Sequence, residues 1–87
     1  MLTKQDHKLL HELVDSLLKM NSKEKMTDFL YGVLTEKEIK EISRRLEIVH
    51  LIKKGLAHKK IAERLEVGVA TVTRGSKELQ KGHFKYV

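Results

Sequence analysis

The stretch that decides the fold runs from residue 61 to residue 74 and reads IAERLEVGVATVTR. Apolar residues recur at helical spacing on both sides of a break at Glu66-Val67-Gly68, which predicts a helix, a tight turn and a second helix. The small side chain of Ala62 lets the two helices cross closely. The apolar side chains expected to bury the corner are Leu65, Val67 and Val72. This layout is that of a DNA-binding helix-turn-helix.

The turn requires an unusual backbone conformation at Glu66. A helix-turn-helix often needs a positive φ after its first helix, and glycine adopts that conformation most easily. A glutamate there is expected to cost on the order of 1 kcal/mol, which a folded domain tolerates.

The outward face of the second helix carries short or cationic side chains. Methyl groups of Ala70 and Thr71 can meet a thymine methyl, and the threonine hydroxyl can bond a base edge or a phosphate. Arg74 and Lys77 can neutralise phosphates. We therefore predict that this face contacts double-stranded DNA. The residues assigned to DNA binding are Lys59, Val69, Ala70, Thr71, Thr73, Arg74 and Lys77.

The charge distribution agrees with an anionic partner. The net charge of the 87 residues is +6. Residues 1–43 carry seven lysines and arginines against eight acidic residues, whereas residues 44–87 carry eleven against four. The basic second half indicates nucleic acid as the simplest partner.

Composition indicates one all-α domain over residues 1–87. The chain has no proline and five glycines, too little turn punctuation for a strand-rich fold. We expect residues 1–55 to form the core and dimerisation helices and residues 56–82 the helix-turn-helix. The chain has no cysteine, no apolar run of about 18 residues and no export signal, which predicts a cytoplasmic protein without a membrane span.

The first expected helix, roughly residues 4–20, opens with a capping box of Thr3 and Asp6. Its apolar side chains cover an arc of about 180°, wider than the roughly 100° stripe of a surface helix, so we expect two buried faces and a dimer that covers one of them. A short helix should then begin after Asn21-Ser22 and end near Val33. The apolar side chains of the first helix are Leu9, Leu10, Leu13, Val14, Leu17 and Leu18.

The third expected helix, roughly residues 36–54, begins with a Thr35 and Glu38 capping box and ends at Gly55. Its apolar positions spread over about 240°, as in a central buried helix, and both Arg44 and Arg45 fall inside that arc. Periodicity alone does not say which arginine faces another part of the molecule.

The run GVATVTRGS at residues 68–76 resembles the tryptophan repressor family, as do Leu34-Thr35 and the RLEIV stretch at residues 45–49. The resemblance extends from about Leu34 to Leu79. It implies an intertwined all-helical homodimer that is not an enzyme and has no cofactor. It also implies a ligand-gated transcriptional repressor, in which L-tryptophan acts as co-repressor and holds the recognition helices for operator DNA.

The resemblance also implies the ligand site. Arg45 corresponds to the arginine that packs on one indole face, and Arg74 to the arginine on the other face that also meets the ligand carboxylate. Gly75 corresponds to a glycine beside the indole. Backbone carbonyls of Leu34 and Thr35 from the partner chain would accept the ligand ammonium. The predicted ligand-binding residues are Arg45, Arg74, Gly75, Thr35, Leu34, Val49 and Glu78.

Glu78 is a departure from the family pattern, because members often have a serine hydroxyl near the ammonium at this position. A carboxylate there can pair with the ammonium or repel the ligand carboxylate. The first alternative is accordingly a repressor-like DNA-binding dimer with a different effector or none.

Two further alternatives belong to other classes. His7, His11 and Asp15 are spaced to hold a metal on the first helix, as in a small metalloenzyme, although no third strong ligand or catalytic base accompanies the histidines. A nucleoid or RNA-binding module without sequence preference would explain the charge but not the string at residues 70–76.

In the tail at residues 83–87, Phe84 and Tyr86 are the side chains able to dock on the domain.

Overall fold

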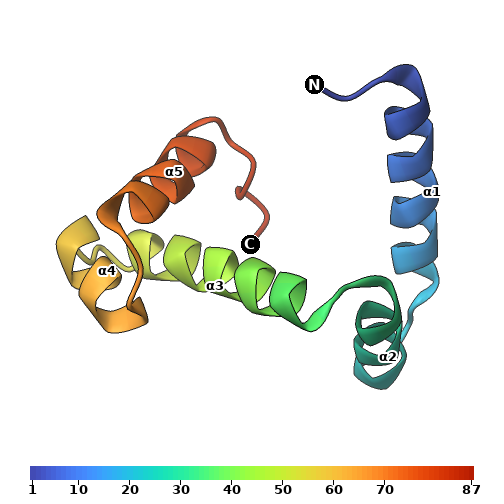
Figure 1. Ribbon diagram of the computed structural model, residues 1–87, viewed down its shortest axis with the longest axis horizontal. Coiled ribbons are helices and arrows are strands. Elements are labelled where there is room, and N and C mark those ends of the chain that lie inside the picture. Colours follow the sequence, from blue (N-terminus) through green and yellow to red (C-terminus); the bar gives the residue numbers. More distant parts are fainter. The chain divides into compact units, whose positions relative to one another are not determined.

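The computed structural model describes residues 1–87 and contains five helices and no strands (Figure 1). The predicted all-α class is therefore confirmed. The chain divides into two compact units, Met1–Ile39 and Lys40–Val87, and each is described by itself. None of the helices is both long enough and apolar enough to cross a membrane. The helices are α1 (Lys4–Lys19), α2 (Lys23–Val33), α3 (Glu36–Lys53), α4 (His58–Leu65) and α5 (Val69–Gln80).

Capping side chains fix where the helices of the first unit begin. The Asp6 amide donates to the Thr3 hydroxyl at 3.1 Å, and the Thr3 amide donates to the Asp6 carboxylate at 2.8 Å, which confirms the capping box. The hydrogen bonds from the Thr3 backbone and then its side chain lower the pKa of the Asp6 carboxyl group. At the start of α2 the Lys25 amide donates to the Ser22 hydroxyl at 3.1 Å.

The first unit lacks buried side chains. No residue of Met1–Ile39 is buried, and α1 exposes 52% of Leu9 and 78% of Leu18. The wide apolar arc expected for α1 is thus present but uncovered in a single chain. Its exposed large side chains are Leu9, Leu10, Leu13, Val14 and Leu18.

Helix α3 has a defined cap at each end. The Glu38 amide donates to the Thr35 hydroxyl at 3.1 Å and the Thr35 amide to the Glu38 carboxylate at 2.8 Å, so the second capping box is also confirmed. The hydrogen bonds from the Thr35 backbone and then its side chain lower the pKa of the Glu38 carboxyl group. At the other end Gly55 has φ of +88° and donates to the Ile52 carbonyl, while Leu56 donates to that of Leu51. This is a Schellman motif, and it explains why the sequence places a glycine there.

The core lies in the second unit, where α3, α4 and α5 meet. Ile48, Ile61 and Val72 are each no more than 1% exposed. Ala62 is buried, and Leu65 and Val67 pack against the cluster, as expected for the corner of a helix-turn-helix. Leu51 is also buried in the cluster, and the partly buried Ile52 and Leu56 pack against it.

The turn between α4 and α5 adopts the strained geometry that the sequence predicts. Glu66 has φ of 55° in the left-handed region, and the Val67 amide donates to the Ala62 carbonyl at 3.0 Å. A glutamate in that conformation costs on the order of 1 kcal/mol relative to glycine. Ala57 and Gly68, which precede α4 and α5, provide no side-chain cap.

Candidate ligand-binding cleft and recognition face

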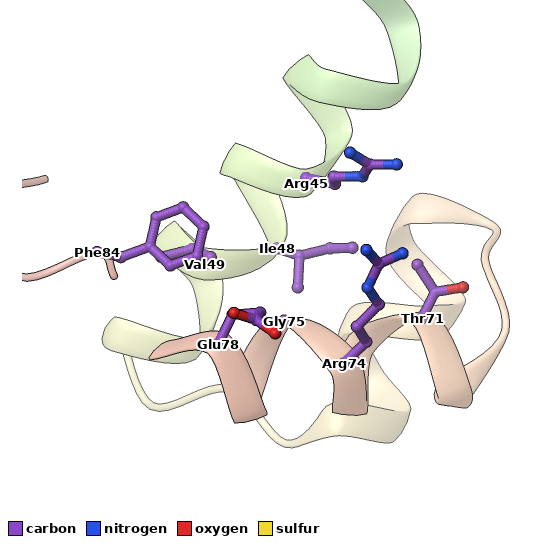
Figure 2. Close-up of a pocket in the computed structure, with 8 residues that line it drawn as sticks. All are labelled: Arg45, Ile48, Val49, Thr71, Arg74, Gly75, Glu78 and Phe84. Atoms are coloured by element: carbon purple, nitrogen blue, oxygen red, sulfur yellow. The ribbon is translucent and has the colours of Figure 1, made fainter. Parts of the chain in front are cut away.

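A cleft of about 260 Å³ lies between α3 and α5 in the second unit (Figure 2). Its volume is close to the lower end, about 300 Å³, of the range for small-molecule sites. Five of the predicted ligand residues are on α3 or α5 within its lining: Arg45, Val49, Arg74, Gly75 and Glu78. The other lining residues are Ile48, Thr71 and Phe84.

Gly75 sets how closely the two helices approach. A Cβ atom built on Gly75 would lie 2.9 Å from Cγ2 of Ile48, which is shorter than real carbon contacts allow. Ile48 is itself only 1% exposed and is branched at Cβ, so its Cγ2 cannot swing aside. The absence of a side chain at Gly75 therefore lets α5 lie against α3 at the floor of the cleft.

Two arginines reach the cleft from different helices. Arg45 comes from α3 and Arg74 from α5, and Figure 2 shows their guanidinium groups at the same end of it. Both residues are exposed, and neither forms a salt bridge. Arg44 lines a neighbouring cleft of about 280 Å³ that also includes Arg45 and Arg74. Arg45, unlike Arg44, lines the cleft that contains Val49 and Phe84.

Glu78 is contacted by basic side chains of the segment that follows it. Its carboxylate lies 3.2 Å from Nζ of Lys81 and 3.7 Å from Nε2 of His83, the latter an ion pair only when the imidazole is protonated. Lys81 is therefore a cationic neighbour of the Glu78 carboxylate.

Phe84 is a cleft residue that the sequence-based site assignment did not include. It is half-buried, whereas Tyr86 is 90% exposed. Nζ of Lys53 donates to the Phe84 carbonyl at 2.6 Å and to a backbone oxygen of Val87 at 2.7 Å. Residues 81–86 form turns with no helical period, so no sequence pattern could place the ring. Ile48, which is also absent from the predicted ligand-binding residues, lines the cleft as well.

The predicted DNA-contacting residues lie mainly on the surface. Thr73 is half-buried. Thr71 and Arg74 are exposed and also line the ligand cleft, so one stretch of α5 contributes to both surfaces. The other exposed residues of the assignment are Lys59, Val69, Ala70 and Lys77.

Leu34 and Thr35 lie in the first unit and are not part of the cleft lining. Leu34 caps the end of α2, and the Thr35 carbonyl accepts the Ile39 amide at 2.9 Å. A carbonyl oxygen has a second lone pair for a further donor. Their role toward a ligand bound by a partner chain stays a prediction.

The structure brings no three His, Cys, Asp or Glu side chains together as a metal site, at His7 and His11 or elsewhere.

Comparison with known proteins identifies the family of the chain. The family model of the Trp repressor protein matches residues 8–87. The chain belongs to the Trp repressor family. A Trp operon repressor homolog of Vibrio vulnificus is 39% identical over 71 residues, which cover 79% of this chain and 69% of the relative. A Trp operon repressor homolog of Photobacterium profundum is 39% identical over 70 residues, 79% of this chain and 68% of the relative.

The match confirms the resemblance seen in the sequence. The Trp repressor family consists of DNA-binding transcription regulators and not of enzymes. The exposed, cationic face of α5 is the part of the structure that suits this class.

Proposed function

We propose that the chain is a transcriptional repressor that binds operator DNA as a homodimer when L-tryptophan fills the cleft between α3 and α5. The proposal rests on Thr71 and Arg74, because both residues line the cleft and also lie on the exposed face of α5. A ligand in the cleft would therefore contact the same helix that meets DNA, and its occupancy would bias the position of that helix.

The side chains of the cleft suit an aromatic amino acid. A guanidinium group has a flat face that stacks on an aromatic ring and a fork that binds a carboxylate. Arg45 and Arg74 supply two such groups without ion-pair partners. Ile48 and Val49 form the apolar part of the same lining. In this arrangement the arginines hold the indole on both faces, and Arg74 also binds the ligand carboxylate.

Glu78 favours an ammonium-bearing ligand over a simple anion. A ligand carboxylate placed beside it would be repelled, whereas an ammonium group would be attracted. Lys81 already neutralises part of its charge, which reduces both effects. Glu78 is also the observation that favours the second candidate, a repressor-like DNA-binding dimer with another effector or none.

For DNA binding, we propose that α5 enters the major groove as a recognition helix. Ala70 and Thr71 would meet base edges, while Lys59 and Lys77 would meet phosphates, with Val69, Thr73 and Arg74 completing the contacts. The ligand then strengthens DNA binding only by its differential affinity for the two positions of α5, typically about 1–3 kcal/mol.

A homodimer is supported by the first unit. Because no side chain of Met1–Ile39 is buried in the single chain, its apolar residues have too little cover for a stable monomer. A second copy that packs against α1 would bury the exposed leucines.

The test is selection of binding sites from random double-stranded DNA by the purified protein, in parallel with L-tryptophan, with L-leucine and without an amino acid. The proposal expects one two-fold symmetric sequence to be enriched only with L-tryptophan. Equal enrichment in all three arms would instead support the effector-independent candidate. Binding without enrichment of any sequence would overturn both.

A further inference from the structure

We propose that Phe84 is a ligand-contacting wall of the cleft that selects for a flat aromatic ring, and that Lys53 is the positioning residue that holds it there. This inference rests on the proposed function, because it names further residues of the same ligand site.

Two sets of hydrogen bonds fix the segment that carries Phe84. Gly82, with φ of +89°, donates to the Leu79 carbonyl, and the His83 amide donates to the Glu78 carbonyl, so the chain turns sharply after α5. Further along, the ammonium group of Lys53 donates to the Phe84 carbonyl at 2.6 Å. Hydrogen bonds from a charged donor are shorter and stronger than neutral ones. The last turn of α3 therefore anchors the tail at the residue that lines the cleft.

The ring of Phe84 lies against the apolar part of the cleft. Figure 2 shows it beside Val49, on the other side of Ile48 from the guanidinium groups of Arg45 and Arg74. Ile48 and Val49 are each 1% exposed, so the part of the cleft next to the Phe84 ring is apolar and its side chains are fixed by packing. The cleft thus has a cationic end and an aromatic end.

The position of Phe84 is specific to that residue and is not shared by the tail as a whole. Tyr86, two residues later, is 90% exposed, and its ring is approached by Nζ of Lys85 at 5.3 Å from the centroid. The chain therefore offers an aromatic residue of the same tail, outside the cleft, as a matched control.

This geometry gives Phe84 a role in selectivity. Aromatic rings prefer offset or edge-to-face contact with another ring, and such pairs gain affinity beyond the area that they bury. An indole held between the two arginines can still meet the Phe84 ring with its edge, whereas a branched aliphatic side chain gains no such contact. The cleft therefore prefers aromatic over aliphatic amino acids.

The experiment is calorimetric titration of the whole protein with L-tryptophan and with L-leucine. Phe84→Leu, which keeps an apolar wall and removes the ring, should weaken L-tryptophan binding about 3- to 10-fold and leave the weaker L-leucine binding unchanged. Tyr86→Leu should change neither. Circular dichroism melting establishes that each variant is folded.

Lys53 is tested by its dependence on Phe84. Lys53→Gln should weaken L-tryptophan binding by a similar factor, and Lys54→Gln, one residue further, should not. Because Lys53 acts through Phe84, the Lys53→Gln substitution should have no further effect on L-tryptophan binding in the Phe84→Leu background.

The outcomes separate this inference from the proposed function. Wild-type protein that binds L-tryptophan while Phe84→Leu binds it equally well overturns the inference and leaves the proposed function intact. Additive losses from Lys53→Gln and Phe84→Leu overturn the role of Lys53. Wild-type protein that does not bind L-tryptophan overturns the proposed effector and this inference with it.

Discussion

Gly75 and Ile48 lie so close that a Cβ atom on Gly75 would stand 2.9 Å from Cγ2 of Ile48. This approach presses α5 against α3 and forms the floor of the cleft that also contains Arg45 and Arg74. A glycine within a helix normally lowers stability relative to alanine. At position 75 the glycine is nevertheless required, because a side chain there would prevent the contact between the two helices.

Gly75→Ala should therefore destabilise the protein, although alanine is the better helix former. Overpacking against Ile48 costs about 1–3 kcal/mol, against a gain of up to about 1 kcal/mol in helix propensity. Gly32→Ala is the control, because a Cβ there meets nothing within 4 Å, and it should raise stability. Urea denaturation measures both. A Gly75→Ala protein stabilised as much as Gly32→Ala would show that the contact is absent.

The exposed leucines of α1 predict a dimer without a stable folded monomer. Leu13→Glu should abolish the dimer and most of the helical circular dichroism at the same concentration. Gln5→Glu, which adds the same charge at an exposed polar position of α1, should leave both unchanged. Sedimentation across a dilution series provides the measurement, and a helical species of about 10 kDa in the wild-type protein would contradict the prediction.

Contacts to DNA should divide into two kinds. Lys77→Ala should weaken binding to every sequence alike and reduce the slope of log affinity against log salt by about 2 for the homodimer, because each protomer loses one phosphate contact. Lys59→Ala should behave in the same way. Thr71→Ala should instead change the preference among operator variants, measured by competition binding. If that preference is unchanged, the recognition face is placed wrongly.

The capping box at the start of α3 predicts a pH dependence. Hydrogen bonds from Thr35 lower the pKa of Glu38 in the folded protein, so the carboxylate stabilises the fold above its ordinary pKa and loses that effect as pH falls through the lowered value. The difference in melting temperature between wild type and Glu38→Gln should be largest near neutral pH and should shrink in acid. A difference that does not change with pH would argue against this role.

The sequence predicted those features that depend on neighbouring residues. Both capping boxes, the end of α3 at Gly55 and the positive φ of Glu66 follow from side chains within a few positions of each other, and the structure has all of them. Helical periodicity likewise identified Val72 as a core residue.

Features that depend on contacts between residues far apart in the sequence were harder to predict. Helical periodicity placed Arg44 and Arg45 in the same apolar arc and did not distinguish them. The position of α5 does distinguish them, because Arg45 lines the cleft with Val49 and Phe84 and Arg44 does not. Phe84 lies in a tail without a period, and Lys53, which holds it, is 31 positions away. Apolar content alone could not show this pairing, because the anchoring bond goes to a backbone carbonyl.

The two arginines should differ in what their loss affects. Arg74→Ala should reduce both L-tryptophan and DNA binding, because Arg74 lies in the cleft and on the exposed face of α5. Arg45→Ala should reduce ligand binding and ligand-dependent DNA binding, while DNA affinity without ligand stays nearly unchanged. Fluorescence anisotropy of labelled operator DNA, with and without L-tryptophan, separates the two effects.

The most direct test of the ligand clamp is calorimetric titration of L-tryptophan into wild-type, Arg45→Ala, Arg45→Lys and Arg64→Ala proteins. Arg64 is an exposed arginine of α4 outside the cleft lining, so Arg64→Ala should bind like wild type. Arg45→Ala should lose at least about 30-fold in affinity, or about 2 kcal/mol. Lysine should fail almost as badly, because it keeps the charge without the flat stacking face. An Arg45→Ala protein that binds L-tryptophan as tightly as wild type would contradict the clamp.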